Sequence, residues 1–418
     1  MAIERVKVRF APSPTGIPHI GNIRTALFNY LFAKNTGGQF ILRIEDTDQK
    51  RLVKGAEEAI YESLSWLGLK QDGEIIHQSQ RLDIYKKHSQ ILLDKKVAYE
   101  KDGAIWVSIP KERTFEWIDL VGNKKIKFEG NTQEDFVILK SDGFPTYHLA
   151  NVVDDHLMEI TQVIRGEEWI SSVPKHIYLY ESFGWEKPEF AHLPVILGSD
   201  KSKLSKRQGA KSVLDYRDEG YLKEAVVNFL ALLGWNSGGD KEQMTIDEIS
   251  KLFKLENVNT ANPIFDEKKL EWLNGIWIRS LAAKRELEII LKEKYAKDTD
   301  VLWVFDSVHK DLIIGLAATR MKTLNDFKNL VSGLGKKTNF SYEDKKIASR
   351  LAEFLEMENW KEKNFIDILR KFNKDTKVDF KKIYYLLTGQ KEGLPLPELL
   401  KIQGGKTEFL KKFKENIK

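Results

Sequence analysis

The sequence predicts an α/β fold, in which a parallel sheet opens the chain and helices fill its C-terminal third. Residues 5–11 alternate apolar and charged side chains, which indicates a strand that ends in a proline-rich turn. From residue 18, apolar side chains recur at helical spacing as far as a pair of glycines, which indicates a helix. A second strand at 39–44 and a second helix at about 55–67 repeat this order. Alternating strands and helices are typical of parallel sheets, whose ligands bind where the strands end.

The composition indicates a globular protein of two or three domains, with 418 residues, 42% hydrophobic residues and 11 prolines. There is no cysteine, which excludes disulfides and thiolate metal sites and fits a reducing compartment. The N-terminus lacks a basic stretch followed by an apolar one, and no run of about 18 apolar residues occurs. We therefore expect a soluble cytoplasmic protein with no membrane partner. Five scattered histidines show no ligand spacing and are interpreted as structural: His77, His88, His176, His192 and His309.

The positive charge of the chain is concentrated in its C-terminal third. Residues 279–418 hold 30 Lys and Arg against 21 Asp and Glu, an excess of 9, which leaves −4 for residues 1–278 of a chain with net charge +5. Helical patterns at 281–295 and 347–355 fall in this region. Such a basic helical surface could bind a polyanion, or it could be a solvated lysine-rich face.

The stretch His19-Ile20-Gly21-Asn22 lies between the first strand and the first helix. A helix N-terminus presents free N–H groups and partial positive charge, which favours phosphate oxygens. Gly21 leaves room for a flat base or a backbone to approach closely. The alternative is an ordinary helix start with His19 on the surface. The sequence lacks both the Gly-x-Gly-x-x-Gly turn expected of NAD-binding proteins and the Gly-x-x-x-x-Gly-Lys loop expected of P-loop proteins. Both classes are therefore disfavoured.

A basic loop at residues 198–209 contains Lys203-Leu204-Ser205-Lys206-Arg207 between two glycines. Its cations could clamp a triphosphate and stabilise the charge that develops on departing pyrophosphate. A solvated basic loop is the alternative for this segment in isolation. The pairing of this loop with the upstream stretch favours an ATP site.

Six stretches, in this order, resemble the glutamyl-tRNA synthetases of bacterial type, a family of class I aminoacyl-tRNA synthetases. They comprise residues 9–16, 19–22, 43–48, 147–156, 164–169 and 203–207. Residues 387–389 and 393–396 resemble the anticodon-binding region of the same family. The resemblance therefore covers nearly the whole chain.

The resemblance implies a Rossmann-like catalytic domain with a connective insertion, followed by an α-helical anticodon-binding domain. The domains would be residues 1–235, with an insertion at about 95–135 for the acceptor end of tRNA, then a stem-contacting linker at 236–300 and a helical domain at 301–418. The insertion has no cysteines, so no zinc is expected. Tyr384 and Tyr385 depart from the family pattern, which leaves the anticodon-reading residues open.

The resemblance also implies the reaction and its site. Glutamate would attack the α-phosphate of ATP, and the glutamyl group would then pass to tRNA(Glu); whether tRNA(Gln) is also charged stays open. A carboxylate is already a nucleophile, so the protein need only position the reactants and stabilise charge. Mg²⁺ would accompany ATP, with no protein metal ligands, and the enzyme would be a monomer. The implied catalytic residues are His19, Lys203 and Lys206. The implied ATP-binding residues are His19, Gly21, Asn22, Lys203, Leu204, Ser205, Lys206 and Arg207.

Glutamate has two carboxylates and one ammonium, so its pocket needs cations and an acceptor. Arg9 and Arg165 can each make two-pronged contacts with a carboxylate, and Glu45 suits the ammonium. Which arginine binds which carboxylate stays open, and Arg9 could instead form a salt bridge at its strand end. The glutamate-binding residues implied by the resemblance are Arg9, Ala11, Ser13, Glu45, Tyr147, Asn151 and Arg165. Three alternative functions are disfavoured. A glutaminyl-tRNA synthetase is disfavoured by the helical C-terminal third, and a catalytically silent RNA-binding protein by the intact motifs. The short paralogue that glutamylates a modified base in tRNA lacks the anticodon-binding region that residues 387–389 and 393–396 resemble.

Overall fold

A computed structural model describes residues 5–204, 211–333 and 338–417 of the chain. The chain forms two compact units. The N-terminal unit comprises Met1–Asp218 and Lys223–Leu270, and the C-terminal unit comprises Glu219–Leu222 and Glu271–Lys418. The three-part division expected from the sequence stays a prediction.

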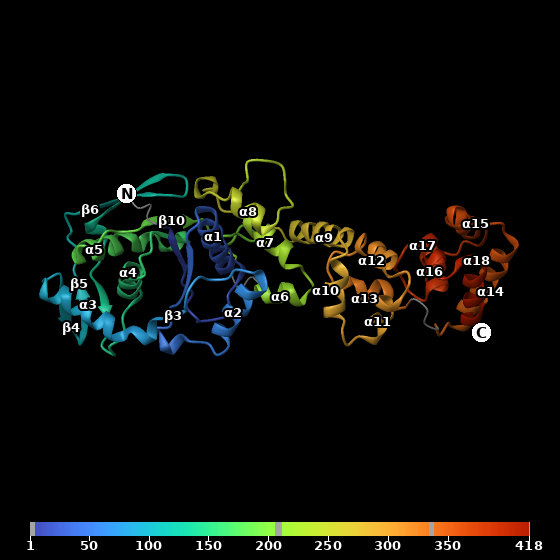
Figure 1. The fold of residues 1–418 in the computed structure, drawn as a ribbon, viewed down its shortest axis with the longest axis horizontal. Coiled ribbons are helices and arrows are strands. Elements are labelled where there is room, and N and C mark those ends of the chain that lie inside the picture. The colour runs from blue at the N-terminus through green and yellow to red at the C-terminus, as the bar shows by residue number, and fades with distance from the viewer. Residues whose placement is uncertain (1–4, 205–210, 334–337, 418) are drawn as a thin grey trace. The chain divides into compact units, whose positions relative to one another are not determined.

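The N-terminal unit contains the parallel strands that the sequence predicts, which confirms the α/β fold class (Figure 1). Its strands form three sheets, ordered β1-β2-β3, β7-β6-β10-β9 and β4-β5-β8. The strands are β1 Lys7–Phe10, β2 Gln39–Ile44, β3 Ile76–His77, β4 Ala98–Lys101, β5 Ala104–Val107, β6 Thr114–Asp119, β7 Lys124–Glu129, β8 Phe136–Leu139, β9 Gln162–Gly166 and β10 Glu189–Leu193. The helices are α1 Ile20–Thr36, α2 Ala56–Leu67, α3 Leu82–Asp94, α4 Tyr147–Leu157, α5 Val173–Phe183, α6 Val213–Asp218, α7 Lys223–Leu232 and α8 Ile246–Leu252, and α9 Glu267–Ala283 leads into the C-terminal unit. Single 3-10 turns occur at η1 Gln49–Arg51, η2 Gln78–Arg81, η3 Gly130–Thr132, η4 Glu167–Ser172, η6 Leu255–Asn257 and, in the C-terminal unit, η7 Glu362–Asn364.

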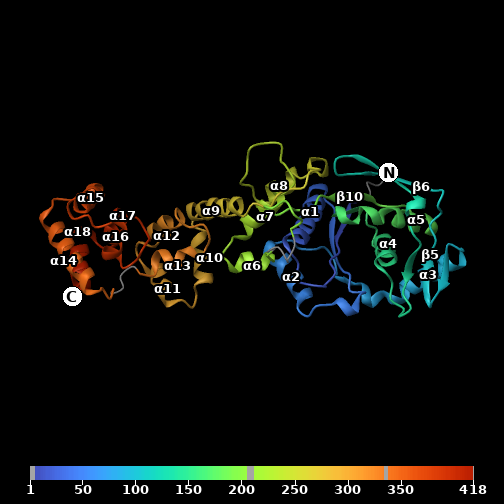
Figure 2. The same cartoon turned by 180° about the vertical axis from the view of Figure 1, so that it is seen from behind.

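The first four elements follow the sequence prediction closely. β2 has the predicted bounds, and α1 begins at Ile20, two residues later than expected, because His19 has an extended backbone and is the N-cap. The helix ends where Gly37 adopts a left-handed backbone with φ 66°. α1 packs against α7 and α8 (Figure 2). Next to these helices the rings of Phe28 and Phe253 meet edge to face, with their centroids 5.2 Å apart.

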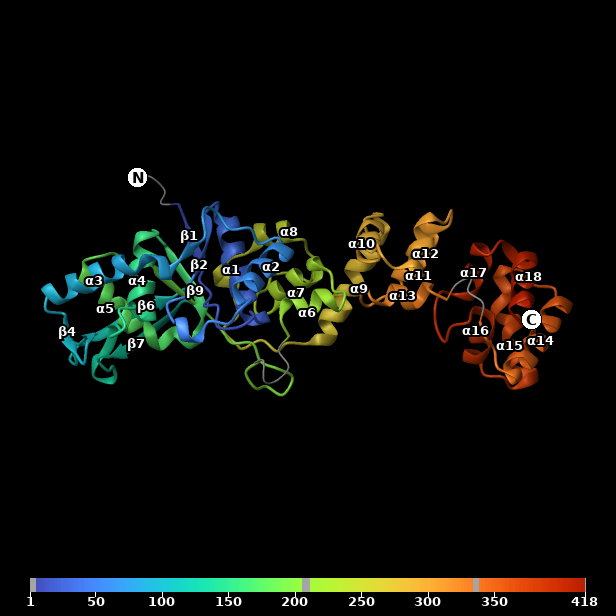
Figure 3. The same ribbon diagram turned by 90° about the horizontal axis from the view of Figure 1, so that it is seen from below.

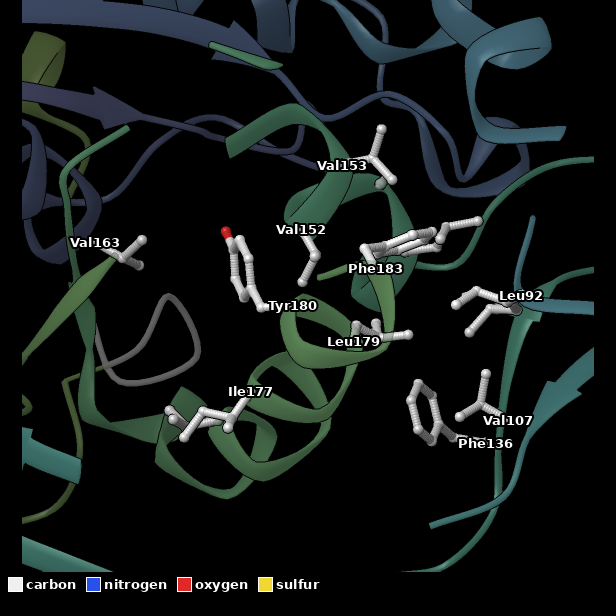
Figure 4. Close-up of a cluster of buried hydrophobic side chains, with 14 of the residues drawn as sticks. Leu92, Val107, Phe136, Val152, Val153, Val163, Ile177, Leu179, Tyr180 and Phe183 are labelled. Carbon is white, nitrogen blue, oxygen red and sulfur yellow. The ribbon is translucent and has the colours of Figure 1, made fainter. Parts of the chain in front are cut away.

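The insertion is fixed to the parallel sheet in two ways. The β6–β7 hairpin lies at the sheet edge, where the N–H of Leu120 donates to the carbonyl of Phe190 on β10 at 2.9 Å. Val107 and Phe136, from the β4-β5-β8 sheet, belong to one hydrophobic core with side chains of α4 and α5 such as Val152 and Leu179 (Figure 4). The insertion is therefore part of the same folded body as the sheet.

The C-terminal unit is helical, and α14 to α18 gather at the end of the chain (Figure 3). Its helices are α10 Leu287–Lys294, α11 Thr299–Asp306, α12 Lys310–Ala318, α13 Asp326–Val331, α14 Tyr342–Met357, α15 Phe365–Thr376, α16 Phe380–Thr388, α17 Leu396–Ile402 and α18 Gly405–Ile417. The helical pattern at 281–295 is not one helix, because Arg285 has φ 62° and a left-handed residue cannot continue a helix. In the described parts of the chain, no helix is long and apolar enough to cross a membrane.

The two glycines after α1 provide a test of this packing. A Cβ at Gly38 would lie 2.4 Å from the carbonyl oxygen of Val6, which accepts the N–H of Gln39, whereas a Cβ at Gly37 would meet nothing within 4 Å. We expect Gly38→Ala to destabilise the protein by about 2 kcal/mol or more through this clash. Gly37→Ala, the matched control, should cost only about 1 kcal/mol for its left-handed backbone. Thermal unfolding of both variants would measure the difference, and equal losses would contradict it.

Candidate active site

A pocket of about 280 Å³ opens where β1, β2 and β9 end. Its walls come from the loops after these strands and from the first two turns of α4. All the residues predicted to bind glutamate line it, namely Arg9, Ala11, Ser13, Glu45, Tyr147, Asn151 and Arg165. Segments that are up to 156 residues apart in the sequence therefore meet at one site, as expected for the carboxyl edge of a parallel sheet.

A buried ion-pair network, formed by Arg9, Arg43, Glu45 and Asp155, lies at one side of this pocket. Asp155 Oδ1 accepts hydrogen bonds from Arg9 Nε at 3.0 Å and from Arg43 Nη1 at 2.7 Å, and Arg9 Nη2 reaches Asp155 Oδ2 at 3.3 Å. Arg43 Nη2 donates to Glu45 Oε1 at 3.0 Å. With its amide oxygen turned toward the two arginines, Asn151 accepts a hydrogen bond from Arg9 Nη2 at 3.2 Å and one from Arg43 Nη2 at 3.0 Å. The ion pair considered as an alternative role for Arg9 is thus present, although Arg9 also lines the pocket.

The two carboxyl groups of the network differ in their electrostatics. Burial opposes the charge of Asp155, but Arg9 and Arg43 lower its pKa below the ordinary value. Burial raises the pKa of Glu45, and Arg43 and Arg9 only partly offset that effect. A further cation in the pocket would therefore stabilise the charged form of Glu45.

Arg165 is held mainly by neutral groups. Its Nη1 donates to the Tyr147 hydroxyl at 2.8 Å, its Nε to His192 Nε2 at 3.2 Å, and its Nη2 to the Trp169 carbonyl at 3.3 Å. The ring of His176 lies 3.4 Å from Nη1. In the described part of the chain, no carboxylate forms an ion pair with Arg165, although the side chain is only 5% exposed. Its charge is thus suited to an anionic ligand in the pocket.

Several residues of this site were not predicted from the sequence. His176 and His192, which the sequence analysis interprets as structural, both contact the Arg165 guanidinium. The sequence could have indicated Asp155, because it follows Tyr147 and Asn151 at intervals of four residues and so lies on the same face of α4. The sequence could not have indicated His192, because its position opposite Arg165 depends on the pairing of β9 with β10.

The side chain of His19 caps the N-terminus of α1. Its Nδ1 accepts the N–H of Gly21 at 3.0 Å, and its backbone N–H donates to Asn22 Oδ1 at 3.2 Å. The neutral imidazole therefore carries its proton on Nε2. A Cβ at Gly21 would lie 2.8 Å from His19 Cε1, so this glycine also makes room for the histidine ring.

The two predicted ATP motifs lie beside one pocket, which Ile20 from the first motif and Leu204 from the second both line. His19 forms an isolated antiparallel bridge with Ser212, just after the basic loop, and Lys203 forms another with Leu197. The pocket has a volume of about 760 Å³, with Ser199 and Lys211 also among its lining residues. Lys203 and Leu204 are described, whereas Ser205, Lys206 and Arg207 lie outside the described residues.

A buried pair of histidines behind the pocket predicts a pH effect on stability. Burial, with help from Lys175 and Arg165, lowers the pKa of His148 to about 4, and its Nδ1 lies 3.2 Å from Nε2 of His176. The unfolded chain binds this proton below pH 6.5, so stability is lost as the pH falls from about 6.5 to about 4. We expect His148 to contribute a loss of about 2 kcal/mol between pH 7 and pH 5. Urea unfolding at both pH values should show a shallower pH dependence in His148→Gln; an unchanged dependence would contradict the assignment.

Comparisons with known proteins agree with this geometry. The family model of class I tRNA synthetases (E and Q), catalytic domain, matches residues 5–105 and 100–272. The glutamate–tRNA ligase of Clostridioides difficile strain 630 is 36% identical, over 96% of this chain and 97% of that one, and the ligase of Alkaliphilus metalliredigens is 37% identical, over 100% and 98%. The crystal structure of a glutamate tRNA ligase from Elizabethkingia meningosepticum, in complex with its amino acid, is similar at a TM-score of 0.78 and 33% identity, over 99% of both chains.

These matches confirm the resemblance that the sequence motifs indicated. They extend over the whole chain rather than over the catalytic motifs alone. The chain belongs to the glutamate–tRNA ligase family of class I aminoacyl-tRNA synthetases.

Proposed function

We propose that this chain forms glutamyl-adenylate from L-glutamate and ATP, and then transfers the glutamyl group to the 3′-terminal adenosine of tRNA(Glu). In the first step a glutamate carboxylate oxygen attacks the α-phosphorus and pyrophosphate leaves. In the second step the tRNA hydroxyl attacks the acyl carbon and AMP leaves. The observation that carries the proposal is that one pocket brings together Arg165, for which the described residues provide no ion-pair partner, and the buried carboxylate of Glu45.

The charges of the pocket support glutamate as its ligand. Arg165, oriented by Tyr147, would bind a substrate carboxylate, and Glu45 would accept the substrate ammonium. Arg9, Ala11, Ser13 and Asn151 would complete the site. Glutamine has no second carboxylate and would leave a buried cation without an anionic partner. Such a mismatch would favour glutamate strongly over glutamine.

ATP would bind at the α1 N-terminus and in the neighbouring pocket of about 760 Å³. His19 would donate from Nε2 to a phosphate oxygen, and Gly21 and Asn22 would lie at the nucleotide. Lys203 and Lys206 would stabilise the charge on departing pyrophosphate, with Leu204, Ser205 and Arg207 completing the loop. The described residues contain no group of three or more His, Asp or Glu side chains that could hold a metal, and we propose that Mg²⁺ arrives on the nucleotide phosphates. No zinc is proposed.

The remaining assignments concern tRNA. The insertion at about 95–135 would bind the acceptor end, residues 236–300 the stem, and the basic helical region at 301–418 the anticodon arm. The positive excess of the C-terminal third supports this last contact. We further propose that the enzyme works as a cytoplasmic monomer.

The direct test is ATP-dependent attachment of labelled glutamate, with glutamine in parallel, to separately purified tRNA(Glu) and tRNA(Gln). We expect glutamate on tRNA(Glu); additional charging of tRNA(Gln) would make the enzyme non-discriminating. If glutamine alone were attached, the chain would be a glutaminyl enzyme. If neither amino acid were attached while control enzymes were active, the chain would be a silent RNA-binding protein.

Lys206→Ala separates catalysis from RNA docking. Because Lys206 is proposed to act on transition-state charge, we expect activation to slow by about 100-fold while the Kd for tRNA(Glu) changes less than about twofold. Single-turnover aminoacylation and a filter-binding titration would measure the two quantities. A parallel loss of RNA affinity would contradict this role.

A further inference from the structure

The insertion contributes one buried side chain to the surroundings of the glutamate pocket. Asp119, the last residue of β6, is 3% exposed. Its Oδ1 accepts the backbone N–H groups of Val121 and His192, both at 3.1 Å, and its Oδ2 contacts His192 Nδ1. Asp119 thus connects the insertion to the strand β10.

His192 connects this carboxylate to Arg165. Arginine is always protonated, so the contact of its Nε with His192 Nε2 at 3.2 Å requires a lone pair on Nε2. The proton of the neutral ring must then sit on Nδ1, where Asp119 accepts it. The buried position of His192, at 4% exposure, agrees with a neutral ring.

The strand register makes this arrangement a property of the fold. Arg165 on β9 and His192 on β10 are direct partners in a parallel pair, and Asp119 is the partner of Phe190, two residues before His192. Residues two apart on a strand share a face, so the three side chains follow one another across one face of the sheet.

We propose that Asp119 is a positioning residue of the glutamate site: it fixes the tautomer of His192 and thereby the orientation of Arg165 toward the substrate carboxylate. Without the carboxylate, His192 can carry its proton on Nε2, which would set an N–H donor against the Nε–H donor of Arg165. Tyr147 and the Trp169 carbonyl would still hold the other end of the guanidinium, so the effect is a loss of glutamate affinity rather than of the fold. The proposal rests on the proposed function.

Asp119→Asn is the main test, because an amide can accept or donate and no longer selects one tautomer. We expect the KM for glutamate to rise about tenfold, with the KM values for ATP and tRNA within about twofold of wild type. Glu116→Gln is the matched control: it makes the same chemical change on the same strand, but at a partly exposed carboxylate paired with Lys125 at 2.6 Å. Melting temperatures would show that both variants fold.

A double-mutant cycle tests whether Asp119 acts through His192. His192→Gln should also raise the glutamate KM, and adding Asp119→Asn to it should change that KM no further. Independent, multiplicative effects, or an equal rise in the KM for ATP, would overturn the proposal. Failure of the wild type to charge tRNA with glutamate would instead overturn the proposed function. In that case calorimetric titration with glutamate would compare the wild type with Asp119→Asn directly. An equal Kd for glutamate would overturn the inference.

Nitrogen chemical shifts supply a readout that general destabilisation would not move. The chain has 8 histidines, and the missing ring signals of His192→Gln would assign those of His192. Wild type should show the tautomer protonated on Nδ1, and Asp119→Asn a mixture of both. An Nε2-protonated ring in the wild type would overturn the inference.

Discussion

The candidate site depends on one buried carboxylate, that of Asp155, which joins α4 to two strands. It is 1% exposed and contacts Arg9 from β1 and Arg43 from β2. Burying charges costs several kcal/mol each, and the cost is offset only where every partner is in place. The network therefore fixes the rotation of α4 about its axis. Because Asn151 and Tyr147 lie one and two turns earlier on the same face, they are placed toward the pocket by the same constraint.

The two arginines of the pocket are held in different ways, and the difference decides what each can do. Arg9 shares its charge with Asp155, whereas Arg165 is surrounded by a hydroxyl, two imidazoles and a carbonyl, which accept its protons without neutralising it. Glu45 lies in the same pocket with a raised pKa caused by burial. Under the proposed function, the bound amino acid would supply a carboxylate to Arg165 and an ammonium to Glu45, whose burial Arg43 offsets only in part.

Local sequence signals predicted the parts of this site that depend on local structure. The bounds of β2, the end of α1 at Gly37 and the seven residues predicted to bind glutamate all lie within short segments, whose periodicity or family resemblance could be recognised directly. Contacts set by pairing between distant strands could not be read in this way. His192 lies beside Arg165 only because β9 and β10 pair in one register, and Asp119 reaches His192 only because a hairpin of the insertion pairs with β10. The prediction of a single helix over 281–295 was wrong for a different reason. Arg285 adopts a left-handed backbone, and no glycine or asparagine at this position indicated such a turn.

The neutral state of the histidines is itself part of how the site holds a cation. Burial and the charge of Arg165 lower the pKa of His176 well below its ordinary value, and burial lowers that of His192 even though Asp119 favours its protonation. A protonated ring at either position would replace an acceptor by a donor and add a second positive charge beside the guanidinium. The apolar surroundings of α4 and α5 thus have an electrostatic role as well as a packing one: by keeping water from the imidazoles they preserve the lone pairs that orient Arg165. A hydrophobic core shared by the insertion and the sheet therefore helps to hold Arg165, one of the two arginines that line the pocket, in its orientation.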